Sequence, residues 1–109
     1  MEKVTEILNS LGDLKKDLRK QFKQLTPQEM SIFSLIYELT DQKIEVNYPI
    51  LSSKTNLTES SIRDYVQKLV KKGIPLQKTK ENNKRVTLFL PEEFKKIASL
   101  ETIALLRSL

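Results

Sequence analysis

Residues 57–90 read LTESSIRDYVQKLVKKGIPLQKTKENNKRVTLFL, and the spacing of their apolar residues changes once along the segment. From Ile62 onward, apolar residues recur at the 3.6-residue spacing of an α-helix. The hydroxyl group of Thr58 can cap the first turn of such a helix. Gly73 suits the position that follows a helix C-terminus, because glycine adopts a left-handed backbone without steric cost. The pattern predicts a helix over residues 58–72.

After Gly73, apolar and polar residues alternate, which is typical of half-buried β-strands. One alternating run begins at Ile74, and a second ends at Leu90. The pair Asn82-Asn83 between them tolerates the positive φ angles of a hairpin turn. Residues 74–90 are therefore expected to form a β-hairpin.

Upstream of this segment, the sequence predicts a central helix that begins at Thr26-Pro27-Gln28-Glu29. Thr26 can cap the helix, Pro27 suits its first position, and the Glu29 carboxylate can complete a capping box. We expect this helix to run to about Leu39 and to supply much of the core, since it is apolar on more than one side.

Residues 44–57 lie between the helix that begins at Thr26 and the helix predicted over residues 58–72, and their sequence predicts a short strand followed by a short helix. Residues 44–46 alternate as in a short strand, and Asn47 can cap a short helix across residues 49–54. Asn56 tolerates the left-handed backbone of a tight turn. Two short capped helices joined by a tight turn are typical of a helix-turn-helix unit.

Both ends of the chain are predicted to be helical, and the 109 residues suffice for a single domain over 1–109. The N-terminal segment, 1–25, carries a heptad-like apolar stripe, and the C-terminal segment, 91–109, begins a helix at Pro91 and breaks near Ser99. These stripes either pack on their own domain or join two copies of the chain. The candidate dimer-interface residues are Val4, Ile7, Leu8, Leu11, Leu14, Leu18, Ile103 and Leu106.

The order of elements over residues 26–90 resembles the winged helix-turn-helix superfamily. Residues 57–90 resemble the recognition helix and wing of MarR-type and biotin-repressor-type prokaryotic transcription regulators. The resemblance implies a mainly α fold with a small β-hairpin wing (α+β), a core over 26–90 and flanking N- and C-terminal helices. It also implies a double-stranded DNA partner and dimerisation through the flanking helices.

Residues 58–90 hold eight basic and three acidic residues, so the net charge of this segment equals the net charge of the whole chain, +5. Positive charge concentrated in one segment is typical of a protein that binds a polyanion. On the polar face of helix 58–72, Arg63 can contact guanine and Gln67 can read adenine. Asp64 can accept from a cytosine amino group or pair with Lys68. The candidate DNA-binding residues are Ser60, Ser61, Arg63, Asp64, Gln67, Lys68, Lys71, Lys80, Asn82, Asn83, Lys84 and Arg85.

Composition excludes several other functions. The chain has neither cysteine nor histidine, which removes thiolate chemistry and the commonest general base and metal ligand. Its glycines stand alone, so it has no glycine-rich phosphate loop. We therefore expect no enzymatic activity, no metal and no cofactor. No apolar run approaches the roughly 20 residues that span a bilayer, and no signal peptide is recognisable, which favours the cytoplasm.

The sequence thus predicts sequence-specific double-stranded DNA binding by a small, homodimeric transcription regulator. Helix 58–72 is expected in the major groove, with hairpin 74–90 on the DNA backbone or in the minor groove. The alternative is a winged-helix protein-interaction module within a larger nucleic-acid-processing or other complex.

Overall fold

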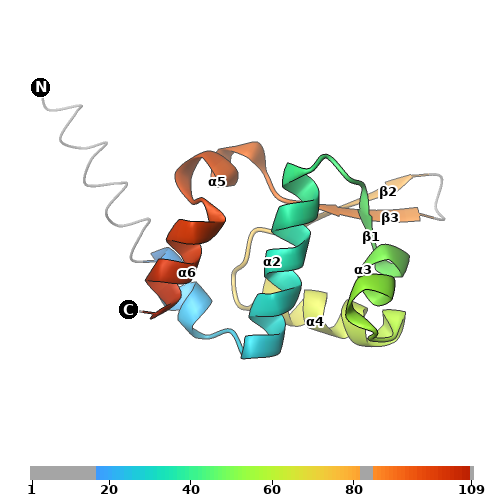
Figure 1. Ribbon diagram of the computed structural model, residues 1–109, viewed down its shortest axis with the longest axis horizontal. Coiled ribbons are helices and arrows are strands. Elements are labelled where there is room, and N and C mark those ends of the chain that lie inside the picture. Colours follow the sequence, from blue (N-terminus) through green and yellow to red (C-terminus); the bar gives the residue numbers. More distant parts are fainter. Residues whose placement is uncertain (1–16, 82–84, 109) are drawn as a thin grey trace, which may run out of the picture.

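The computed structural model describes residues 17–81 and 85–108. Residues 17–23 are helical. The elements that follow are α2 (Pro27–Asp41), β1 (Val46–Asn47), α3 (Tyr48–Thr55), α4 (Glu59–Lys71), β2 (Gln77–Glu81), β3 (Arg85–Phe89), α5 (Glu92–Ile97) and α6 (Leu100–Ser108). The described part is mostly helical with a small antiparallel sheet, so the predicted α+β, winged-helix-like architecture is confirmed (Figure 1).

The N-terminus of α2 forms the predicted capping box. The Glu29 backbone N–H donates to Thr26 Oγ1 at 3.2 Å, and the Thr26 backbone N–H donates to Glu29 Oε1 at 2.8 Å. Pro27 begins the helix, which needs no N–H donor there. The helix continues to Asp41, two residues beyond the predicted end at Leu39, and crosses the middle of the molecule.

The helix-turn-helix unit is built by the predicted local signals. Asn47 Oδ1 accepts the backbone N–H of Ile50 at 2.9 Å and caps α3. Asn56 is left-handed, with φ at 61°, and Thr58 Oγ1 accepts the backbone N–H of Ser61 at 3.1 Å at the start of α4. Gly73 ends this helix with φ at 89°. The side chains of Asn47 and Thr58 thus begin the two helices, and the left-handed residues Asn56 and Gly73 end them. All four signals are local in the sequence.

The sheet has the strand order β1-β3-β2, and both pairs are antiparallel. Val46 pairs with Leu88, and Gln77 pairs with Phe89. The strands start later than predicted: β1 occupies 46–47 rather than 44–46. Likewise, β2 begins at Gln77 rather than at Ile74, because a tight turn, in which the Leu76 N–H donates to Ile74 O at 2.8 Å, precedes the strand.

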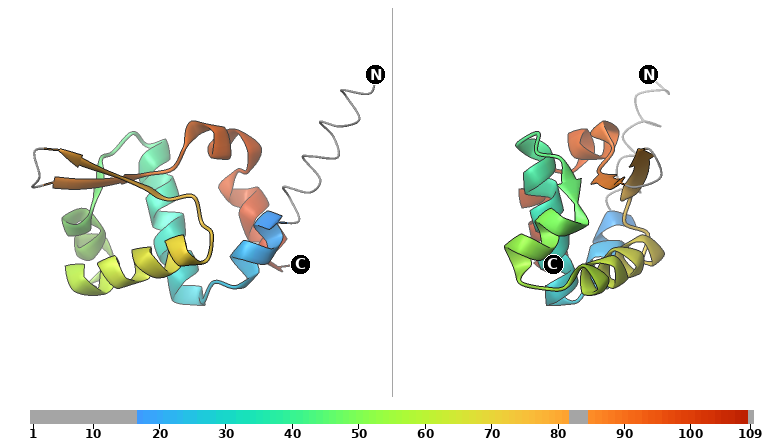
Figure 2. Two further views of the ribbon diagram at one scale, coloured as in Figure 1. Left: turned by 180° about the vertical axis from the view of Figure 1, so that it is seen from behind. Right: turned by 90° about the vertical axis from the view of Figure 1, so that its right-hand side faces the viewer.

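In the view from behind, α4 and the hairpin β2–β3 both lie in front of α2 (Figure 2). The helix formed by residues 17–23 packs with α6 at the other end of the molecule (Figure 1). This arrangement leaves α4 and the hairpin together on one side of the molecule.

A hydrophobic core joins the helices to β1 and β3, and it includes residues predicted to lie between subunits. Leu18 and Ile103 are buried inside the chain, at 6% and 0% exposure, and Leu106 packs partly buried against the same core. Leu18 and Ile103 are therefore core residues of the chain itself rather than interface residues, whereas the partly buried Leu106 keeps some exposed surface. The other candidate interface residues (Val4, Ile7, Leu8, Leu11 and Leu14) lie outside the described residues.

The C-terminal segment forms two helices that break near Ser99, as predicted. Pro91 differs from the prediction by one position, since it is the N-cap of α5 rather than its first residue. Two contacts hold α5 against α2. The Tyr37 hydroxyl donates to Ala98 O at 3.0 Å, and Lys95 Nζ lies 2.8 Å from Asp41 Oδ1.

Candidate nucleic-acid interface

The outward face of α4 carries the predicted polar side chains. Ser60, Arg63, Asp64 and Gln67 are exposed, and with Ser61 they line a shallow hollow on this face. Their common orientation follows from the opposite face, where Ile62, Val66 and Leu69 are fully buried. The Ser61 hydroxyl is engaged at the helix start, where it accepts from Thr58 Oγ1 at 3.0 Å. The structure therefore brings the predicted α4 residues together on one surface.

Arg63 is held by an aromatic neighbour that the sequence did not indicate. Its guanidinium carbon lies 5.1 Å from the centre of the Tyr48 ring, a cation–π arrangement. Tyr48 begins α3 and is itself buried, so the ring is a fixed platform. A second hollow lies beside this pair, lined in part by Glu59 and Val86. Arg63 thus lies between the outward face of α4 and the sheet.

Asp64 is paired along its own helix. Lys68 Nζ lies 3.2 Å from Asp64 Oδ2, and the same ammonium lies 5.6 Å from the centre of the Tyr65 ring. The sequence left two roles open for Asp64, acceptance from a cytosine amino group or pairing with Lys68, and the structure contains the pairing with Lys68. Because both side chains are more than half exposed, at 62% and 54%, this ion pair is weak and can open for another ligand.

A third hollow separates the C-terminal half of α4 from the hairpin. It is lined by Gln67, Val70, Lys71, Leu76 and Lys78, and most of its wall is apolar. Val70 belongs to the apolar residues that recur along α4, but it is 44% exposed. The fully buried stripe of α4 consists of Ile62, Val66 and Leu69, and Val70 lies at its edge.

The hairpin supplies further basic residues next to α4. Lys78 and Lys80 of β2 are exposed. Arg85 pairs through its backbone with Glu81 at the end of the ladder. The remaining predicted residues of the wing tip (Asn82, Asn83 and Lys84) lie outside the described residues.

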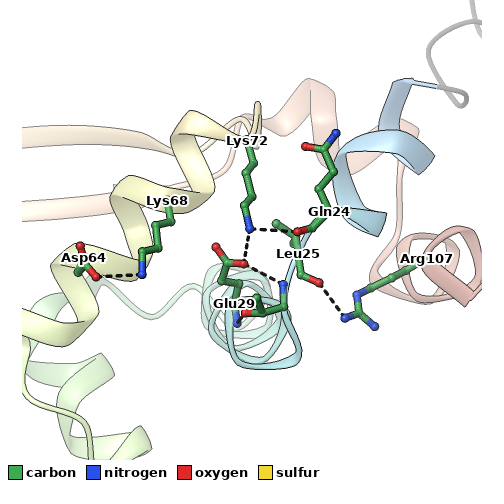
Figure 3. Close-up of polar contacts among 8 residues, drawn as sticks. Gln24, Leu25, Glu29, Asp64, Lys68, Lys72 and Arg107 are labelled. Carbon is green, nitrogen blue, oxygen red and sulfur yellow. Dashed lines mark hydrogen bonds and ion pairs between the residues drawn. The ribbon is translucent and has the colours of Figure 1, made fainter.

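Lys72 does not belong to the exposed basic surface. Its Nζ donates to Glu29 Oε1 at 2.6 Å and to Gln24 O at 3.0 Å, which joins the end of α4 to the start of α2 (Figure 3). Burial raises the pKa of the Glu29 carboxyl, but hydrogen bonds from Lys72 and Thr26 outweigh it and leave this pKa below its ordinary value. Glu29, 1% exposed, is thus a charged core residue that orients α4. The capping box in the sequence predicts the hydrogen bonds between Glu29 and Thr26, but no local pattern predicts the contact between Glu29 and Lys72.

Two findings on the described residues concern metal binding and membrane insertion. No group of three or more acidic side chains in residues 17–81 and 85–108 is arranged to hold a metal ion. None of the described helices is both long and apolar enough to cross a membrane.

Arg63 and Gln67 connect the three hollows. Arg63 borders the first and second, and Gln67 borders the first and third. These two side chains, which carry hydrogen-bond donors that match base edges, therefore lie at the centre of one continuous surface. The chain matched no protein-family model, no curated protein and no solved structure.

Proposed function

We propose that this protein binds double-stranded DNA sequence-specifically and acts as a small transcription regulator. The observation that carries the proposal is the position of Arg63 and Gln67 at the centre of the surface formed by α4 and the hairpin. An α-helix fits the major groove of B-DNA, where arginine pairs with guanine and glutamine with adenine. In this arrangement α4 enters the major groove.

The lysines around this centre suit contacts with phosphates. Lys71 lies on α4, and Lys78 and Lys80 lie on β2, so they flank the base-reading side chains from two elements. Contacts with phosphates position a protein on DNA without reading its sequence. Hairpin β2–β3 then reaches the backbone or the minor groove beside the groove that α4 occupies. The protein is further proposed to act in the cytoplasm as a homodimer.

A second function, docking of a protein partner within a larger nucleic-acid-processing or other complex, is favoured by one observation. The Asp64–Lys68 ion pair places a negative charge in the middle of the outward face of α4. That charge opposes the approach of phosphates and suits a surface with mixed charges. Winged-helix folds serve both DNA and protein recognition, so the fold does not choose between the two.

A salt series with duplex DNA separates the two functions. Fluorescence anisotropy would measure the affinity of the protein for labelled duplexes from low to physiological salt. For a DNA-binding protein, log K should fall linearly with log[salt], and the slope counts the neutralised phosphates. The double variant Lys71→Ala/Lys80→Ala should flatten the slope by about two units, since two phosphate contacts are lost.

Lys96→Ala is the matched control, because it removes an exposed lysine from α5, away from the proposed surface. Its slope should equal that of the wild-type protein. Absence of any affinity for duplex DNA at low salt would refute DNA binding and favour the protein-docking function.

A further inference from the structure

Val70 is an exposed apolar side chain beside the polar face of α4. It is 44% exposed, whereas its neighbour across the hollow, Leu76, is only 7% exposed. Lys71 and Lys78 stand at the same hollow and place positive charge around an apolar floor. Phosphate contacts explain the two lysines, but they do not explain the exposed valine, because phosphate gains nothing from an apolar wall.

The position of Gln67 indicates what the apolar floor meets. Gln67 lines both this hollow and the hollow on the outward face of α4, and Val70 follows it by three residues on the same helix. A helix that brings Gln67 to a base edge therefore brings Val70 to the same part of the major groove. The apolar group exposed in that groove is the C5-methyl group of thymine.

We propose that Val70 and Leu76 receive the C5-methyl group of a thymine, so that this hollow selects an A·T pair beside the base read by Gln67. The inference rests on the proposed DNA binding. Lys71 and Lys78 hold the phosphates on either side of the hollow, which keeps the methyl group against Val70. Burial of the methyl group removes apolar surface from water and is worth about fourfold in affinity.

The test changes only the methyl group. A preferred duplex is first selected from a random pool, and each thymine is then replaced in turn by deoxyuridine, which keeps the base pair and lacks the methyl. At one thymine per half-site, the wild-type protein should bind the uracil duplex about fourfold more weakly. Val70→Ala should bind the two duplexes with affinities within about twofold of each other, because its methyl-binding wall is gone.

Leu105→Ala is the control, since Leu105 is an exposed apolar residue of α6, 62% exposed, and should keep the full uracil effect. Val70→Thr offers a second variant that keeps the shape of the side chain and should reduce the effect. If uracil has no effect at any position, or if Val70→Ala shows the full wild-type loss, the methyl-binding site is refuted while DNA binding stands. If no preferred duplex emerges, this selectivity is also refuted, whereas a failure to bind any duplex refutes the proposed function itself.

Discussion

Lys72 Nζ lies 2.6 Å from Glu29 Oε1, so the C-cap residue of α4 is tied to the first turn of α2 (Figure 3). The Glu29 side chain is 2% exposed and that of Lys72 is 29% exposed. Arg107 reaches the same region from α6, where its Nη2 donates to Leu25 O at 3.0 Å. The turn before α2 is therefore held from two sides, and the orientation of α4 depends on a charge pair at its base.

Replacing Lys72 by methionine should lower the free energy of unfolding by about 3 kcal/mol, because the buried Glu29 carboxylate would lose its cation. Denaturant unfolding followed by circular dichroism measures this loss. Lys71→Met is the matched control: Lys71 is exposed, and its replacement should change stability by no more than about 0.5 kcal/mol. Equal losses for the two variants would contradict the importance of the Lys72–Glu29 pair.

The same pair should make stability depend on acid pH. The pKa of Glu29 is lowered in the folded protein relative to its ordinary value, so the folded state favours the carboxylate. This contribution is complete above the unfolded pKa, about 4.3, and is lost as the pH falls through the folded pKa. The difference in stability between the wild-type protein and Glu29→Gln should be constant above about pH 5 and shrink below about pH 4. Urea titrations between pH 6 and pH 3 measure it, and a difference that grows in acid would reverse the assigned direction.

Gly73→Ala should destabilise the protein by about 1–2 kcal/mol, because an alanine does not readily adopt the left-handed backbone found there, with φ at 89°. A Cβ atom at this position would also lie 2.8 Å from Gln21 Nε2, which must move aside. Gly73→Asn shares the Cβ but tolerates the left-handed region better, so it should be the milder change in thermal unfolding. An alanine variant as stable as the wild-type protein would exclude backbone strain at this turn.

Arg63→Ala and Lys80→Ala should weaken DNA binding in different ways. Loss of Arg63 should cost about 1–3 kcal/mol on the preferred duplex and relax the base preference at one position, because a base edge carries sequence information. Loss of Lys80 should weaken all duplexes alike and flatten the salt slope by about one unit. Binding measurements on preferred and scrambled duplexes distinguish the two, and equal losses on every duplex would leave only non-specific binding.

The homodimer prediction now depends on residues before the described part of the chain. Charged replacements at Leu11 and Leu14 should give a folded monomer in light scattering if these residues join two copies. Leu18→Asp should instead unfold the protein, since Leu18 lies in the core at 6% exposure. A native protein that remains monomeric at all concentrations would refute the dimer.

Local signals were sufficient to predict most helix boundaries. Thr26, Asn47 and Thr58 cap their helices through bonds to backbone groups three residues away, and Gly73 ends α4 through its own conformational freedom. Such interactions depend on neighbours in the sequence, so the helix order and the polar face of α4 could be predicted without a structure. The strand limits were predicted less accurately, because they depend on pairing with a distant strand. Val46 at the start of β1 pairs with Leu88, and Gln77 at the start of β2 pairs with Phe89, both near the end of β3.

Only the tertiary structure decided which side chains meet across the fold. The pairing of Lys72 with Glu29 spans 43 positions in the sequence, and the ring of Tyr48 meets Arg63 from a different helix. The 44% exposure of Val70 is likewise a property of the packed structure, because it depends on which elements cover that edge of α4. By itself, the sequence determined the composition of the proposed DNA-binding surface. Packing determined its shape, since contacts between distant residues depend on how the helices and the sheet lie against one another.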